Sequence, residues 1–145
     1  MITKLSHCLL FVLDQDSAKE FYTEKLGFEV RTDFQMGEGF EAGGSGFRWL
    51  TVSPPDQPDV VVILADAAMG SDEQTAKQIR ALLAKGALGA TVFDTDDCQK
   101  TYEELSARGV VFTSEPAERP YGIEAVFRDD SGNTFSLTER RQFAG

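Results

Sequence analysis

The sequence predicts an α+β domain built from two βαβββ modules, and two observations support that prediction. The first is the succession of strand-like and helix-like patterns in each half of the 145-residue chain. The second is an internal repeat, because residues 12–16 and 22–24 recur as residues 92–96 and 102–104 at a constant offset of 80. With two residues inserted, residues 26–30 then align with residues 108–112. This period exceeds the roughly 20–50 residues of solenoid repeats and indicates a duplicated module.

In the first half, apolar residues alternate over residues 5–12, which is typical of a strand. Ser17 and Glu20 have the spacing of a capping box, so a short helix is expected to begin at Ser17 and to end near Gly27. Further strands are expected at 28–34, 47–52 and 60–65, with a glycine-rich loop or interrupted hairpin over residues 35–45.

A second capping box, at residues 71–74, predicts a connecting helix that closes at Gly86. The second half then repeats the order strand, acidic turn, helix and glycine stop. Its remaining strands are expected at residues 110–113, 123–127 and 134–138, the last two joined by a turn at 129–133. We therefore expect one domain over residues 1–145, with a first module at 1–66, a connecting helix at 67–86 and a second module at 87–141.

The composition excludes several classes of protein. Fourteen basic against twenty-four acidic residues give a net charge of −10 and a pI near 4.5, so nucleic acid and anionic membranes are poor partners. Cys8 and Cys98 are the only cysteines, which argues against a disulfide framework or a structural zinc knot. No apolar segment has the length of a membrane span, and residues 1–7 lack an apolar signal core, so a cytoplasmic location is expected.

Several short segments together resemble the vicinal oxygen chelate (VOC) superfamily of glyoxalases, bleomycin-resistance proteins, fosfomycin-resistance proteins and extradiol dioxygenases. The resemblance extends over nearly the whole chain, and the residues that carry it are His7, residues 12–14, residues 21–22, residues 26–28, residues 127–133 and Leu137. The resemblance implies two βαβββ modules that form a cupped mixed sheet around a ligand cleft, commonly within a homodimer.

Metal-dependent members of that superfamily hold a divalent ion with four side chains. By resemblance, the positions in this chain are His7, Ile63, Leu88 (or Ala87) and Ser136, of which only His7 matches the usual ligands. Because catalytic metal sites need about three protein donors, we expect no conventional metal or other cofactor. The nearest carboxylates that a different register would offer are Asp59, Asp66 and Glu139.

The candidate ligand-binding residues are His7, Arg48, Tyr121, Glu124, Arg128 and Ser136. For His7, the roles weighed are a wall of the cleft, catalytic proton transfer and a hydrogen-bonded core histidine. Arg48 is suited either to holding an anionic group or to carrying a solvated charge, and the adjacent Trp49 is interpreted as core or dimer packing in preference to ligand stacking.

The second half supplies the other candidates. Residues 118–122 either close the mouth of a pocket through Tyr121 or simply turn the chain. Glu124 and Arg128 share one face of a strand and are candidates for an exposed ion pair. Cys8 points away from His7 along an alternating strand, and Cys98 is interpreted as packing, so no Cys-His nucleophile is expected.

The leading hypothesis is a homodimeric, glyoxalase-like protein that binds a small organic molecule, with the acidic surface favouring a cationic ligand. The alternative is a metal-dependent lyase, isomerase or dioxygenase that uses His7 as a ligand. A third hypothesis is a structural or regulatory protein whose dimer surface is the functional feature.

Overall fold

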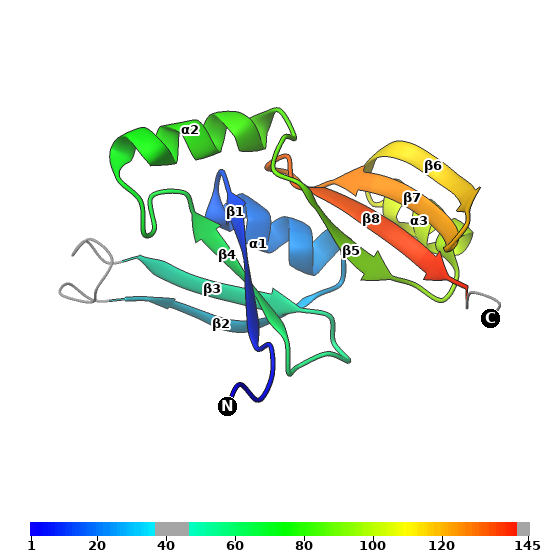
Figure 1. Cartoon of the computed structure of the whole chain (residues 1–145), viewed down its shortest axis with the longest axis horizontal. Helices are drawn as coiled ribbons and strands as arrows, with labels where there is room; N and C mark the ends of the chain where they lie inside the picture. The colour runs from blue at the N-terminus through cyan, green and yellow to red at the C-terminus, as the bar shows by residue number, and fades with distance from the viewer. Residues whose placement is uncertain (37–46, 142–145) are drawn as a thin grey trace.

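The computed structural model describes residues 1–36 and 47–141, which fold into two four-stranded mixed sheets (Figure 1). The first sheet has the order β1-β4-β3-β2 and the second has the order β5-β8-β7-β6. In each sheet the first and last strands of the module run parallel and the other neighbours run antiparallel. The predicted α+β fold class with two βαβββ modules is therefore confirmed.

The strands lie close to the predicted ranges. Their bounds are β1 His7–Val12, β2 Glu29–Gln35, β3 Arg48–Ser53, β4 Val61–Asp66, β5 Ala90–Asp94, β6 Val111–Arg119, β7 Gly122–Arg128 and β8 Thr134–Arg140. The main difference is β6, which continues to Arg119, so that only Pro120 and Tyr121 separate it from β7. Most of the glycine-rich segment expected at residues 35–45 lies outside the described residues.

The helices begin one to three residues away from the predicted caps. Asp14 caps α1 (Gln15–Glu20) by accepting a hydrogen bond from the Ser17 amide, so the capping box expected at Ser17 is wrong. The helix continues as a π-helical turn, η1 (Phe21–Lys25). Asp72 caps α2 (Glu73–Ala84) through the Thr75 amide, and Asp97 caps α3 (Cys98–Ala107) through the Lys100 amide. Short acidic side chains take these positions because their oxygens reach the unpaired amides of the first turn.

The duplication is present, but its offset along the strands differs from the predicted 80 residues. The two equivalent helix caps, Asp14 and Asp97, are 83 residues apart. The offset of 83 differs from the predicted 80 by an odd number of residues. Since side chains alternate between the two faces of a strand, residues that the predicted repeat aligned in β1 and β5 lie on opposite faces of their sheets. Val12 is accordingly buried in the core, at 1% exposure, whereas Val92 is 54% exposed on the opposite side of its sheet.

One face of each sheet packs against helices, and these faces share one hydrophobic core. The core joins Leu50, Val52 and Leu64 of the first sheet to Phe127 and Phe135 of the second. Tyr22, at the end of the first helix, packs edge-on against Phe135 with ring centroids 6.3 Å apart. The two modules are therefore held together through the helical side of both sheets.

A polar cluster at the β7–β8 turn reinforces this junction. The buried Asp129 carboxylate accepts hydrogen bonds from the amides of Ser131, Gly132 and Asn133, each at 2.9 Å, and from Tyr22 Oη at 2.7 Å. Burial and the neighbouring Asp129 raise the pKa of Tyr22 well above its usual value. The side chain of Asn133 donates a hydrogen bond to the carbonyl of Phe11, so the β7–β8 turn of the second module binds β1 of the first module.

The described residues contain no helix that is both long and apolar enough to cross a bilayer.

Candidate functional site

The faces that point away from α1 and α3 carry most of the predicted site residues, and we call them the first and second distal faces. The first distal face consists of His7, Leu9, Phe11, Trp49, Thr51, Val61, Ile63 and Ala65. The second consists of Ala90, Val92, Asp94, Glu124, Val126, Arg128, Thr134, Ser136, Thr138 and Arg140. Strand pairing makes the two sets equivalent, since Leu9 lies opposite Ile63 just as Val92 lies opposite Ser136.

The second distal face contains a pocket of about 470 Å³, to which Val92, Tyr121, Glu124, Ser136, Thr138, Arg140 and Arg141 contribute. One of its polar groups is the Glu124 carboxylate, which accepts hydrogen bonds from Ser136 Oγ at 2.5 Å and Tyr121 Oη at 2.7 Å. Ser136 Oγ also lies 2.7 Å from Thr138 Oγ1. The structure thus brings three predicted residues, Tyr121, Glu124 and Ser136, into one network.

These hydrogen bonds shift the acidity of both titrating groups. The Ser136 hydrogen bond is the main cause that holds the pKa of Glu124 below its usual value, against the opposing effect of burial. The hydrogen bond to Glu124 raises the pKa of Tyr121. Glu124 is therefore an anion and Tyr121 a neutral phenol at neutral pH.

The arginines around this pocket are each close to a carboxylate. Arg140 Nε donates to Asp94 at 2.8 Å, Arg141 contacts Glu118 at 3.3 Å and Arg119 Nε lies 3.8 Å from Glu124. A carboxylate offers about four lone-pair positions, and Ser136 and Tyr121 occupy two of those on Glu124. The pocket can therefore accept further hydrogen bonds from a ligand that carries an amine, amide or hydroxyl donor.

The local sequence explains how this network forms. Cross-strand pairing places Glu124 opposite Thr138, and the alternation of β8 puts Ser136 and Thr138 on the same face. The tight turn before β7 brings Tyr121 back over Glu124. Gly122 has a φ of 141°, and a Cβ atom there would collide with the backbone of Glu139, so this turn requires glycine.

The first distal face presents apolar and aromatic side chains at equivalent positions. Trp49 takes the place of Glu124, and its ring centroid lies 6.1 Å from that of His7. His7 is exposed, and its Nδ1 lies 2.8 Å from Ser6 Oγ. His7 and the Glu124 network therefore belong to different sheets of the chain.

Arg48 does not join these residues, because its strand position directs it to the helical side of the first sheet. Its guanidinium donates to both oxygens of Asp33, at 2.8 and 2.9 Å, and to Asp16 at 2.6 Å. Hydrogen bonds from Arg48 and Lys19 lower the pKa of Asp33 far below its usual value. The structure thus assigns Arg48 to an ion-pair network in place of the predicted cleft.

Arg128 is also separated from the Glu124 pocket. It lies at the opposite end of β7, beside Thr134, and its Nη2 donates to the carbonyl of Ala84 at 3.3 Å. This contact satisfies a carbonyl in the last turn of α2, where cations are favoured. The exposed ion pair considered for Glu124 and Arg128 is not formed.

The four positions that hold a metal in metal-dependent VOC proteins do not offer a suitable donor set. His7 and Ile63 lie on the first distal face, and the Ser136 hydroxyl donates a hydrogen bond to Glu124. Leu88 precedes β5, and the structural repeat places Ala90 at the position of His7, where a methyl group cannot ligate. Among the described residues, no group of three or more His, Cys, Asp or Glu side chains is arranged around a common point.

The pocket also contains residues that no sequence motif indicated. Thr138 completes the hydrogen-bond chain, and Arg140, which is paired with Asp94 just outside the pocket, forms its charged edge. The two-residue spacing of Ser136 and Thr138 was the available signal, whereas the pairing of Asp94 with Arg140 depends on the register of two strands.

Comparison with known proteins agrees with this architecture. The family model of the Glyoxalase/Bleomycin resistance protein/Dioxygenase superfamily matches residues 4–137. The uncharacterized protein YurT of Bacillus subtilis (strain 168) is 37% identical over 131 residues, which cover 90% of this chain and 94% of YurT.

Two solved structures are informative. The crystal structure of UcmS2 is 50% identical, covers 96% of this chain and 99% of its own, and has a TM-score of 0.85. The structure of TnmS3, an antibiotic binding protein from Streptomyces sp. CB03234, is 28% identical, covers 97% of this chain and 98% of its own, and has a TM-score of 0.71. With a family model that spans almost the whole chain, these results show that the protein belongs to the Glyoxalase/Bleomycin resistance protein/Dioxygenase superfamily, the VOC superfamily.

Proposed function

We propose that this protein binds a small, antibiotic-like organic molecule without chemically changing it, and that the Glu124 pocket supplies its polar recognition. The observation that carries this proposal is the chain of hydrogen bonds from Thr138 through Ser136 to Glu124, completed by Tyr121. Such a fixed anionic acceptor recognises a ligand donor group without first having to be ordered. The similarity to an antibiotic binding protein, TnmS3, supports the same class of ligand.

The charge of the pocket favours a cationic or donor-rich ligand. Glu124 is 19% exposed in its side chain, and the neighbouring arginines Arg140 and Arg141 pair with Asp94 and Glu118. A ligand ammonium or amide placed beside Glu124 would form a charge-assisted hydrogen bond in a partly desolvated site. The chain's net charge of −10 adds a long-range attraction for cations.

A second copy of the chain is proposed to complete the binding cleft. The strands β1 and β5 lie at the edges of their sheets and expose apolar side chains on the distal faces, including Leu9 at 41% and Val92 at 54%. Covering such side chains in a homodimer would remove apolar surface from water and protect two unpaired edges. The aromatic first face of one copy would then complement the polar second face of the other.

The proposed location is the cytoplasm. Cys8 is exposed, Cys98 is buried, and both are free thiols, which suits a reducing compartment.

The proposal is tested by thermal shift and calorimetric titration of the purified protein against a panel of antibiotics that includes the cationic bleomycin. We expect at least one compound to raise the melting temperature, and its affinity to fall about tenfold in Glu124→Gln, because one charge-assisted hydrogen bond is lost. Glu103→Gln, an exposed change on α3, is the matched control. Equal affinity in wild type and Glu124→Gln would place the ligand elsewhere.

A further inference from the structure

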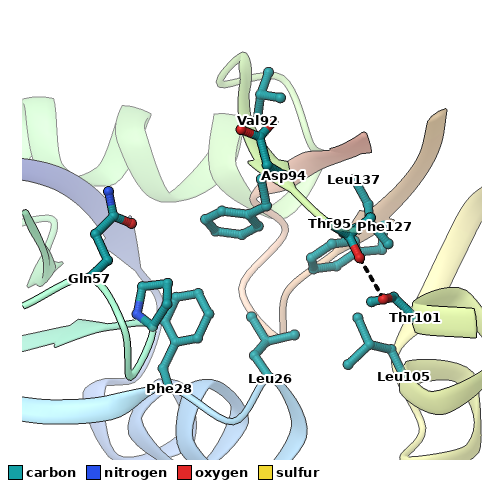
Figure 2. Close-up of a pocket in the computed structure, with 12 residues that line it drawn as sticks. Leu26, Phe28, Gln57, Val92, Asp94, Thr95, Thr101, Leu105, Phe127 and Leu137 are labelled. Carbon is teal, nitrogen blue, oxygen red and sulfur yellow. Dashed lines mark hydrogen bonds between the residues drawn. The ribbon is translucent and has the colours of Figure 1, made fainter. Parts of the chain in front are cut away.

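We propose that the junction between the two modules contains a second ligand site, separate from the Glu124 hydrogen-bond network, for a small neutral molecule with two fused aromatic rings and one hydroxyl group. Val92 and Asp94 of β5 form its border with the second distal face. The site is a cavity of about 410 Å³ on the helical side of the second sheet (Figure 2), which we call the junction cavity. Its volume falls within the range of small-molecule pockets.

The two modules contribute opposite walls of the junction cavity. Leu26 and Phe28, which follow the first helix, form one wall, and Leu105, Phe127 and Leu137 of the second module form the other. Neither module alone encloses this space, so it exists because the modules pack in this orientation.

The walls are apolar and held in place by aromatic packing. The ring of Phe28 meets Phe93 edge-on at 5.5 Å, and Phe93 stacks on Phe135 at 4.7 Å. Aromatic rings arranged in this way favour an inserted ring, which would bury surface and contact their edges and faces. A flat, two-ring molecule is therefore the shape that the walls recognise.

One polar feature within the junction cavity defines the hydroxyl group of the ligand. Thr95 Oγ1 and Thr101 Oγ1 lie 2.7 Å apart, as the dashed line in Figure 2 shows. The Asp97 amide also donates to Thr95 Oγ1 at 3.4 Å. Whichever threonine donates to the other, Thr101 Oγ1 keeps an acceptor lone pair for a ligand hydroxyl. Both threonines are partly buried, and partly desolvated hydroxyl groups discriminate between ligands that can and cannot form the hydrogen bond.

The charge at the cavity edge argues for a neutral ligand. Asp94 is the carboxylate among the lining residues, and its Oδ1 already accepts a hydrogen bond from Arg140 Nε at 2.8 Å. Gln57, on the other side, is neutral (Figure 2). An anionic ligand would lose its hydration next to Asp94 without gaining a cationic partner inside the cavity.

The test uses 2-naphthol as the probe and 2-naphthoate as an anionic control of similar shape. Calorimetry is expected to show one 2-naphthol per chain and at least about tenfold weaker binding of 2-naphthoate, since the carboxylate must be desolvated. In an amide-resolved NMR titration of the whole chain, the largest shift changes should fall on Leu26, Phe93, Thr101 and Leu105.

Two variants connect binding to the junction cavity. Thr101→Val keeps the side-chain shape but removes one hydroxyl, so affinity for 2-naphthol should fall about fivefold, while the exposed Thr113→Val should leave it unchanged. Leu26→Trp should fill the space and abolish binding. If Leu26→Trp does not fold, the location of the 2-naphthol site is tested by the affinities of Thr101→Val and Thr113→Val and by the NMR titration.

Three results would overturn the proposal: no binding up to the solubility limit of 2-naphthol, shift changes centred on Tyr121 and Glu124, or unchanged affinity in Thr101→Val. The second result would still be compatible with ligand binding in the Glu124 pocket, so the two sites are tested separately.

Discussion

The two distal faces have the same backbone and opposite chemistry. On the first sheet, Trp49 occupies the position that Glu124 occupies on the second, and Ile63 corresponds to Ser136. The strand pairing that places them is the same in both modules. Duplication has therefore preserved the scaffold while one face became apolar and the other acquired a hydrogen-bonded carboxylate.

The helical faces differ much less, because both must supply the shared core. Their residues remain apolar, as Leu50 and Leu64 on one side and Phe127 and Phe135 on the other show. Burial constrains these positions in both modules, whereas the distal faces are free to diverge. The functional difference between the modules is thus expected at the distal faces and at the junction between them.

The largest expected effect concerns the turns that precede the last strand of each module. Asp129→Ala should lower the free energy of unfolding by about 3 kcal/mol, because several buried donors lose their acceptor. In the first module the corresponding turn is exposed, and Asp56→Ala should change stability by less than about 0.5 kcal/mol. Urea denaturation of both variants measures the difference, and similar losses would show that the turns are equivalent.

The core alternation and the β7–β8 turn were predictable from local sequence, since both depend on neighbouring residues. Arg48 and Arg128 were not, because their partners Asp33 and Ala84 meet them only after folding. The repeat offset failed for a related reason, since matching aspartates at 14 and 94 concealed that the second helix cap is Asp97. Local patterns predict which residues face outward, while long-range packing decides which of them meet.

The proposed dimer gives the next prediction. Leu9→Asp and Val92→Asp should each weaken self-association by about 2 kcal/mol, or roughly 30-fold, because an unpaired carboxylate would be desolvated in the interface. Light scattering over a dilution series measures the monomer fraction. Equal effects would indicate that both equivalent strands lie in one interface. An effect at only one position would restrict the contact to that sheet, and no effect at either would contradict the dimer.

A ligand identified in the antibiotic panel allows the two distal faces to be compared directly. Glu124→Ala should weaken its binding about tenfold or more, since a charged hydrogen-bond acceptor is lost. Trp49→Ala should have an effect below about threefold if Trp49 serves packing in the dimer. Calorimetry measures both affinities. A larger loss of affinity in Trp49→Ala than in Glu124→Ala would show that aromatic stacking on Trp49, and not the Glu124 carboxylate, is the main contact with the ligand.

The smallest expected effect is a pH dependence confined to the second face. The pKa of Glu124 is lower in the folded protein than its usual value, so its ionisation stabilises the fold above the unfolded pKa of about 4.3. This contribution is lost as the pH falls through the folded pKa. Urea denaturation of wild type and Glu124→Gln at pH 7 and pH 3 should therefore show a stability difference that shrinks in acid.

Trp49→Phe, at the equivalent position of the first sheet, removes no titrating group, and its stability difference from wild type should be the same at both pH values. If the Glu124→Gln difference is also unchanged, the carboxylate is not stabilised by the Ser136 and Tyr121 hydroxyls in the unliganded protein, and the preorganised acceptor on which the proposed recognition depends is absent.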